Sequence, residues 1–265
     1  MEFCPPLAGP GPSVQRGAAS QKECSFFSLL PSLYYLKRYY DGVTDRKQIA
    51  SEFNALTGED FESMTYLDAP NLVGGNKKGF NNPSRHMLYN DPFFGWLDSL
   101  AQDGVVDEYK KIARRLSLKA KQSKNFGYIF KNLSNLCKIL AVKYDFGVRV
   151  RKAYKERNKQ ELQALSNDLS KIEKLIKSFY KSFNELWHKE NKPHGFEVQD
   201  IRLGGLIQRV KACKQRLDGY LNGEIAKLEE LEEVILDFWG NRDKYEKTTP
   251  CCQNWGGTVT ANQIN

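Results

Sequence analysis

The chain has 265 residues, of which 40% are hydrophobic, and a formal net charge of +8. This hydrophobic content predicts a packed core and excludes global disorder. A transmembrane helix is also excluded, because the sequence has no run of about 18 uncharged apolar residues. Residues 1–20 are rich in proline and glycine and lack the cationic start and apolar stretch of a secretory signal. We therefore expect a disordered leader and a cytoplasmic protein.

The first ordered segment predicts the end of a strand followed by a helix. Residues 23–27 (ECSFF) form the short segment that favours a strand end. The run that follows is strongly apolar and aromatic, and Pro31 lies inside it. Because proline is favoured in the first turn of a helix, we expect a helix to begin near Leu30.

A second helix and a long loop come next. Thr44 or Asp45 is a suitable N-cap for this helix, and Gly58 closes it. Residues 68–95 then predict a loop, because they contain repeated glycines, prolines and asparagines. The end of this loop (LYNDPFFGWL) is aromatic and apolar, so we expect the loop to be ordered and packed.

The rest of the chain is predicted to be helical, because apolar residues recur at helical spacing from residue 105 to residue 238. Gly127 separates the first two of these helices. The longest amphipathic run covers residues 162–186 and ends before Pro193. Asp200 is then placed to cap the next helix. Together these elements predict a mainly α fold, an antiparallel helical bundle.

Charge is distributed unevenly along the predicted bundle. Residues 110–159 contain sixteen lysines and arginines against two acids, a net charge of +14, whereas residues 224–237 contain six acids against one lysine, a net charge of −5. These segments either face each other or leave the basic one for an acidic partner. Interleaved aromatic residues also make nucleic acid an alternative ligand. Most of them fall near the apolar face, however, which favours a solvated basic face.

Motifs for catalysis or metal binding are scarce. Asp107-Glu108 is the one Asp-Glu sequence, and its place at a helix start favours an interaction with the helix dipole over acid-base catalysis. The six cysteines form no C-x-x-C pair and the three histidines lack ligand spacing, so we expect no metal, cofactor or disulfide framework. Three loop residues remain candidates for substrate contact: His194, and Asn90 and Asp91, which otherwise form a turn.

Several segments together resemble one protein family. The longest is HGFEVQDIRLGGLIQRVKACKQRLDGYLNGEIAKLEELEEVILDF at 194–238, and four others precede it in family order: ECSFFSLLPSL at 23–33, LTGEDFESMTYLDAPN at 56–71, NPSRHMLYNDPFFG at 82–95 and NLSNLCKILAVKYDFGVRVRKAY at 132–154. The chain resembles the C-terminal part of bacterial β-N-acetylhexosaminidases of glycoside hydrolase family 20. Agreement of several unrelated segments in order and spacing makes the resemblance specific.

The resemblance implies a domain organisation. The family's catalytic domain is a (β/α)₈ barrel, and residues 21–43 look like its final strand and helix, preceded by the leader at 1–20. Residues 44–240 then correspond to a C-terminal helical domain that includes the ordered loop 68–95, and residues 241–265 form a tail. The expected fold is therefore an antiparallel helical bundle preceded by a barrel remnant, as a truncated or split gene would encode.

The resemblance also implies a function. Family members remove terminal N-acetylhexosamine by substrate-assisted catalysis: the 2-acetamido oxygen attacks the anomeric carbon, an Asp orients this group, and the neighbouring Glu protonates the leaving oxygen. That pair lies in an H-x-G-x-D-E type motif, which surrounds neither Asp107 nor Glu108. No catalytic residue carries over, so the chain is expected to be inactive alone. Glu23 looks like the Glu that binds sugar hydroxyls after the last barrel strand.

The family resemblance and the charge pattern each imply binding partners. An N-acetylhexosaminide is expected to bind only if a complementing chain supplies the barrel, and the helical bundle also suits a homo-oligomer. The alternative function is an all-α module that binds nucleic acid or an acidic partner through the basic face 110–159, with nucleic acid the less favoured ligand. No membrane association is expected.

Overall fold

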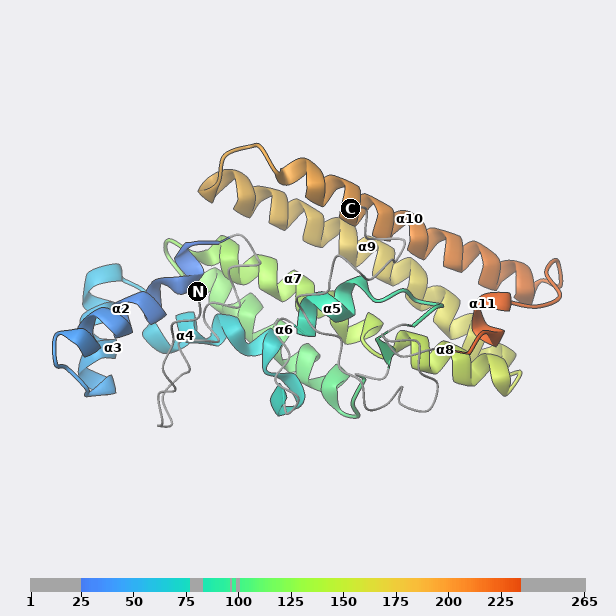
Figure 1. Ribbon diagram of the computed structural model, residues 1–265, viewed down its shortest axis with the longest axis horizontal. Helices are drawn as coiled ribbons and strands as arrows, with labels where there is room; N and C mark the ends of the chain where they lie inside the picture. Colours follow the sequence, from blue (N-terminus) through green and yellow to red (C-terminus); the bar gives the residue numbers. More distant parts are fainter. Residues whose placement is uncertain (1–24, 77–82, 96, 99–100, 235–265) are drawn as a thin grey trace.

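The computed structural model describes residues 25–76, 83–95, 97–98 and 101–234, and this part of the protein is mainly helical and has no strand (Figure 1). Its α-helices are α2 (Leu30–Tyr40), α3 (Arg46–Thr57), α4 (Phe61–Thr65), α5 (Pro83–Tyr89), α6 (Val105–Gln122), α7 (Gly127–Lys143), α8 (Phe146–Lys155), α9 (Lys159–Glu190), α10 (Phe196–Leu221) and α11 (Glu229–Glu232). Short 3₁₀ helices are η2 (Phe27–Leu29), η3 (Tyr66–Asn71) and η4 (Val73–Asn76). The predicted mainly α fold is confirmed.

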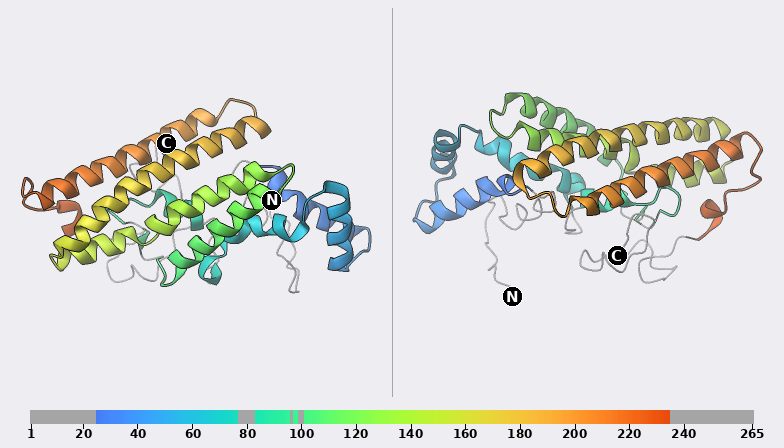
Figure 2. Two further views of the ribbon diagram at one scale, coloured as in Figure 1. Left: turned by 180° about the vertical axis from the view of Figure 1, so that it is seen from behind. Right: turned by 90° about the horizontal axis from the view of Figure 1, so that it is seen from above.

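Four long helices lie side by side in the order α6, α7, α9, α10. Each packs against the next, as the views from three sides show (Figures 1 and 2). The connection from α6 to α7 (123–126) and the connection from α9 to α10 (191–195) are short, so the two helices of each pair run antiparallel. α8 follows α7 after two residues and also packs against α9, whose 32 residues span about 48 Å. The antiparallel helical bundle expected from the sequence is therefore present.

The core of this layer depends on the apolar stripe of α9. The buried apolar side chains of α9 recur every three or four residues, which places them on one face of the helix: Leu162, Leu165, Leu169, Ile172, Ile176, Phe179, Phe183 and Leu186. Asn158 caps the helix, since its side chain accepts a hydrogen bond of 3.0 Å from the main-chain N–H of Glu161. Gly195, at a φ of 97°, then lets the chain reverse into α10.

A lobe made of α2, α3 and α4 lies at one end of the layer (Figure 1, blue). Pro31 occupies the first turn of α2, as predicted. Asp45 caps α3 through a 2.9 Å hydrogen bond from a main-chain N–H, and Gly58 ends α3 at a φ of 70°. The rings of Phe53 and Phe61 meet edge to face in the lobe, with centroids 5.3 Å apart. The predicted start of α2 and the predicted ends of α3 are confirmed.

The expected final strand of a barrel is not visible in the described residues. Ser25 and Phe26 belong to no strand, η2 starts at Phe27, and the residues before Ser25 lie outside the described part. The Ser25 hydroxyl accepts a 3.3 Å hydrogen bond from the N–H of Ser28, and the Ser28 hydroxyl donates to the Ser25 carbonyl at 2.7 Å. These local bonds turn the segment into a helix start, so the strand prediction is wrong for residues 25–27.

The predicted cap of α10 is also wrong. α10 begins at Phe196, four residues before Asp200. Phe196 packs between the rings of Phe183 and Trp187, with centroid distances of 5.7 and 5.6 Å, and this packing sets the helix start. Asp200 instead accepts a 2.7 Å hydrogen bond from the Tyr180 hydroxyl across to α9.

The described part of the predicted loop 68–95, residues 68–76 and 83–95, is packed, as expected, but it is not irregular throughout. It contains the end of η3, all of η4 and α5. Pro83 opens α5, where the missing N–H of proline costs no helical hydrogen bond. Met87 and Leu88 of α5 are buried in the main core. In the part of the chain that the structure describes, none of the helices has both the length and the apolar character to cross a membrane.

Candidate functional site

The predicted substrate contacts do not converge on one place among the described residues. His194 is exposed in the turn between α9 and α10. Asp91 is bonded to Arg209, which lies near the middle of α10, about 20 Å from its first residue. Asn90 therefore has Asp91 as a neighbour but not His194. Glu23 lies outside the described residues, and a sugar contact at any of the four positions stays a prediction.

Asn90 and Asp91 are buried and fully engaged within the protein. The Asn90 amide donates to the Asp98 carboxylate at 2.7 Å and accepts from the N–H of Leu97 at 3.0 Å. The Asp91 carboxylate accepts from the N–H groups of Phe93 and Phe94 and forms a 2.7 Å ion pair with Arg209. Asp91 thus holds the turn after α5 against α10.

Two basic residues of the 110–159 segment lie in the same region, and neither belongs to the solvated face that the sequence predicted. Lys143, at the end of α7, is 3% exposed, and its ammonium donates to the main-chain carbonyls of Met87 and Asn90. Its position could have been read from the sequence, because Lys143 follows Leu136 by seven residues and Leu140 by three on the apolar face of α7.

Arg151 of α8 ties three segments together through main-chain carbonyls. Its guanidinium donates to Phe93 at 2.6 Å, to Glu230 at 3.0 Å, and to Leu231 and Glu233 at 3.1 Å each. The planar group with several fixed donors suits this task, which a lysine could not perform. The acidic segment therefore meets the end of the basic one chiefly through its backbone, although Glu232 also accepts from the Tyr154 hydroxyl at 2.9 Å.

Asp98 completes what we call the buried polar cluster: Asn90, Asp91, Asp98, Lys143, Arg151 and Arg209. One carboxylate oxygen of Asp98 accepts from Asn90, and the other has no hydrogen-bond partner among the described residues. The carboxylate lies so close to α8 that a side chain at Gly147 would collide with it. Position 147 therefore requires glycine, because any side chain there would prevent the close approach of Asp98 to α8.

The environment shifts the pKa of both carboxylates and of Lys143 in this cluster. Burial raises the pKa of Asp98 to about 7, against the opposing effects of Asn90, Arg151 and Lys143. Burial lowers the pKa of Lys143 to about 8, although Asp91 and Asp98 favour its charged form. For Asp91 burial acts to raise the pKa, but the hydrogen bond and charge of Arg209 and the two backbone N–H donors outweigh it, so the pKa lies below its usual value.

The cluster stabilises the fold rather than forming an open site. Its charges are used to join α5, the turn after it, α7, α8, α10 and α11. Within the described residues no group of three or more His, Cys, Asp or Glu side chains is arranged to hold a metal ion. The two buried cysteines, Cys137 and Cys213, are free thiols.

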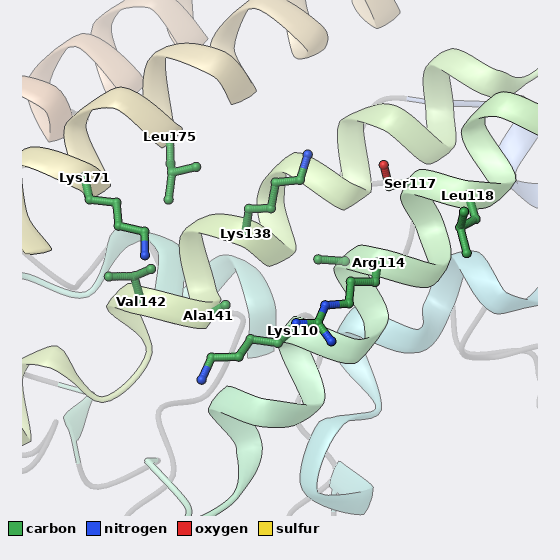
Figure 3. A pocket seen from close by; sticks show the side chains of 10 residues that line it. Lys110, Arg114, Ser117, Leu118, Lys138, Ala141, Val142, Lys171 and Leu175 are labelled. Carbon is green, nitrogen blue, oxygen red and sulfur yellow. The ribbon is translucent and has the colours of Figure 1, made fainter.

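An open feature lies on α6, α7 and α9, and we call it the basic groove (Figure 3). Its volume is about 690 Å³, and its lining residues come from the three helices: Lys110, Ala113, Arg114, Ser117, Leu118, Lys138, Ala141, Val142, Lys171 and Leu175. Four of the ten are cationic and none is acidic. The basic groove is therefore a candidate binding site in the described part of the protein.

The Asp107-Glu108 pair is engaged at the start of α6, as the sequence predicted. Asp107 forms a 2.8 Å ion pair with Lys110, and Glu108 accepts a 2.9 Å hydrogen bond from the N–H of Gly74. Lys110 is the largest cause that holds the pKa of Asp107 below its usual value. Asp107 therefore does not resemble a general acid, which needs a raised pKa.

Together, the fold and these sites define, in the described residues, a mainly helical domain in which buried charges join the helices and an open groove is basic. The chain belongs to the family described as the glycoside hydrolase 20C C-terminal domain, whose model matches residues 59–249. The resemblance noted in the sequence is thereby confirmed for a C-terminal segment related to glycoside hydrolase family 20. No curated protein matches the chain.

Proposed function

We propose that the chain is the C-terminal helical portion of a β-N-acetylhexosaminidase-like glycoside hydrolase and has no hydrolase activity by itself. The observation that carries this proposal is the family match over residues 59–249, which concerns a C-terminal domain. Its role would be to support a catalytic barrel that cleaves terminal N-acetylhexosamine. An N-acetylhexosaminide would then be a ligand of the assembled enzyme.

The state of Asp107 and Glu108 supports the absence of activity. Substrate-assisted cleavage needs one carboxylate to orient the acetamido group and a protonated one to serve as the acid. Here Asp107 is ion-paired on the surface, and Glu108 is bonded to the backbone of Gly74. The two carboxylates thus stabilise the first turn of α6 and its contact with η4.

Exposed aromatic side chains support the docking of a further domain. At the α2 end of the molecule Phe26 is 61% exposed and Tyr40 is 84% exposed, and Phe27, Leu33 and Tyr39 are also open to solvent. We call these four aromatic residues and Leu33, which lie on α2 and just before it, the α2 aromatic patch. Large apolar side chains gathered on one short segment are typical of a surface that another domain covers.

The test is hydrolysis of a chromogenic aryl β-N-acetylglucosaminide. The purified chain is assayed alone, and then mixed with a family 20 barrel that lacks its own helical domain. We expect no turnover by the chain alone and turnover in the mixture well above that of the barrel alone. Turnover by the chain alone would show that the proposal is wrong.

A matched variant identifies the source of any activity. Asp107→Asn combined with Glu108→Gln keeps the shape and the hydrogen-bond acceptor of Glu108 but removes both charges. The variant should complement the barrel as well as the original chain does. A selective loss of turnover, with unchanged binding to the barrel, would instead place this pair in the reaction.

A further inference from the structure

The basic groove has an excess of positive charge that the described part of the chain does not neutralise. Among the described residues, Arg114 and Lys171 form no ion pair, and the ammonium of Lys138 donates to the amide oxygen of Asn135 at 3.1 Å. Of the four cations in the groove, Lys110 alone has a carboxylate partner in the described part of the chain, namely Asp107. The charge of this surface is therefore available to an acidic ligand.

The floor of the groove is apolar. The apolar lining residues are Ala113, Leu118, Ala141, Val142 and Leu175. Ala141, Val142 and Leu175 lie among the cationic side chains, whereas Leu118, which is 60% exposed, lies beyond Arg114 at one edge (Figure 3). A nucleic-acid backbone would neutralise the charges but would bury little of this apolar surface. No aromatic side chain lines the groove for base stacking. The lining thus favours a ligand that carries both acidic and apolar groups.

The arrangement of the lining indicates the shape of that ligand. The five positions on α6 follow the i, i+3, i+4, i+7, i+8 spacing of one helix face, over a length of about 12 Å. α7 lies between α6 and α9, and α9 contributes the other side, so three helices border a groove open to a fourth. Amphipathic helices bind such grooves by inserting the apolar side chains of about two turns.

We propose that the basic groove binds an acidic amphipathic helix of a partner protein, apolar face toward Leu118 and Leu175. The chain's own acidic segment does not serve as this helix in its described part. Glu229 and Glu230 form ion pairs with Arg216 of α10, and Leu228 and Leu231 are buried in the core. Acidic side chains of the partner meet Arg114, Lys138 and Lys171.

The test uses the full chain and a synthetic helical peptide of about 20 residues, with leucines on one face and glutamates on the others. A second peptide has the same composition but a scrambled order that spreads the leucines around the helix. We expect the first peptide to bind, and the scrambled peptide to bind at least several-fold more weakly, in fluorescence anisotropy. Equal affinity for the two peptides would overturn the proposal, because charge alone would then explain binding.

Charge-reversal variants locate the binding site. Arg114→Glu with Lys171→Glu should weaken binding of the amphipathic peptide roughly tenfold or more. Lys152→Glu with Lys155→Glu, on exposed positions of α8 outside the groove, makes the same change in net charge and should have a much smaller effect. Equal weakening by the two pairs would overturn the assignment to the groove.

A third comparison tests the apolar floor. Leu118→Ser should weaken binding roughly fivefold, whereas Leu56→Ser, at a position 72% exposed on α3, should leave it unchanged. A DNA duplex and anionic phospholipid vesicles are assayed in parallel. Tighter binding of either one, with the same dependence on Arg114 and Lys171, would replace the helical partner with a nucleic acid or a lipid surface.

Discussion

At the residue scale, the buried polar cluster shows what periodicity in a sequence misses. Lys143 and Arg151 belong to a segment whose charge predicted a solvated face, yet both are buried against main-chain carbonyls. The spacing of apolar residues along α7 could have indicated that Lys143 is buried. Asp98 and Arg209 could not have been found, because their burial depends on how a turn after α5 meets α8 and α10, far away in the sequence.

Asp98 makes stability depend on pH. Its pKa is about 7 in the folded protein against a usual value of 3.8, chiefly because of burial. Between these values the folded state binds a proton that the unfolded state has lost, so the free energy of unfolding falls as pH rises from about 4 to about 7. Asp98→Asn should remove this part of the slope, a change of roughly 1–4 kcal/mol across the window.

Urea unfolding at about pH 5 and about pH 7.5 measures this difference. Lys143 faces Asp98, but its pKa of about 8 places most of its own titration above this window. Asp103→Asn, at an exposed position, removes one carboxylate in the same way and is the matched control. An identical slope for Asp98→Asn and the original chain would contradict the role of Asp98.

At the element scale, helices with strong local signals were predicted and those that depend on packing were not. Asp45 and Gly58 bound α3 as expected, and the apolar stripe of α9 is buried as expected. The predicted start of α10 was wrong, because ring packing around Phe196 outweighs the capping preference of Asp200. A strand end was predicted where the structure has η2, because Ser25 and Ser28 form hydrogen bonds with each other within one helical turn.

Arg151 provides a prediction about α11, a helix of four residues with little stability of its own. Arg151→Lys keeps the charge but loses most of the bonds to Phe93, Glu230, Leu231 and Glu233, at a cost of roughly 2–4 kcal/mol. We expect faster hydrogen exchange at the amides of residues 229–233, measured by mass spectrometry. Lys152→Met, on the exposed side of α8, should leave that exchange unchanged. Unchanged exchange in Arg151→Lys would mean that buried Leu228 and Leu231 hold the segment alone.

At the scale of the whole molecule, the family and the helical bundle could be predicted from ordered sequence segments. The predicted barrel remnant is not visible in the described residues. The match over residues 59–249 agrees with the helical part of the resemblance. The basic groove was only partly foreseen: the excess of charge was evident, but α9 supplies Lys171 and Leu175 from beyond the basic segment. Only the packing of three helices brings these positions together.

The α2 aromatic patch leads to a prediction about self-association. Without a covering domain, side chains such as Phe26 and Tyr40 should promote reversible association of the chain as its concentration rises. Phe26→Ser with Tyr40→Ser should shift association to roughly tenfold higher concentration, as measured by sedimentation velocity. Leu56→Ser with Val148→Ser, exposed apolar positions on other helices, should not do so. Equal shifts for the two pairs would mean that the patch has no special part in association.

The order of the four long helices has a consequence for how the chain folds. α6 with α7 and α9 with α10 are neighbours in sequence as well as in space, so each pair closes only a short loop when it forms. These two hairpins are therefore expected to form early. The contacts of Arg151 with residues 230–233 join segments about 80 positions apart and would form late. During synthesis, the helical layer could then assemble before the ribosome releases the acidic segment that closes over α8.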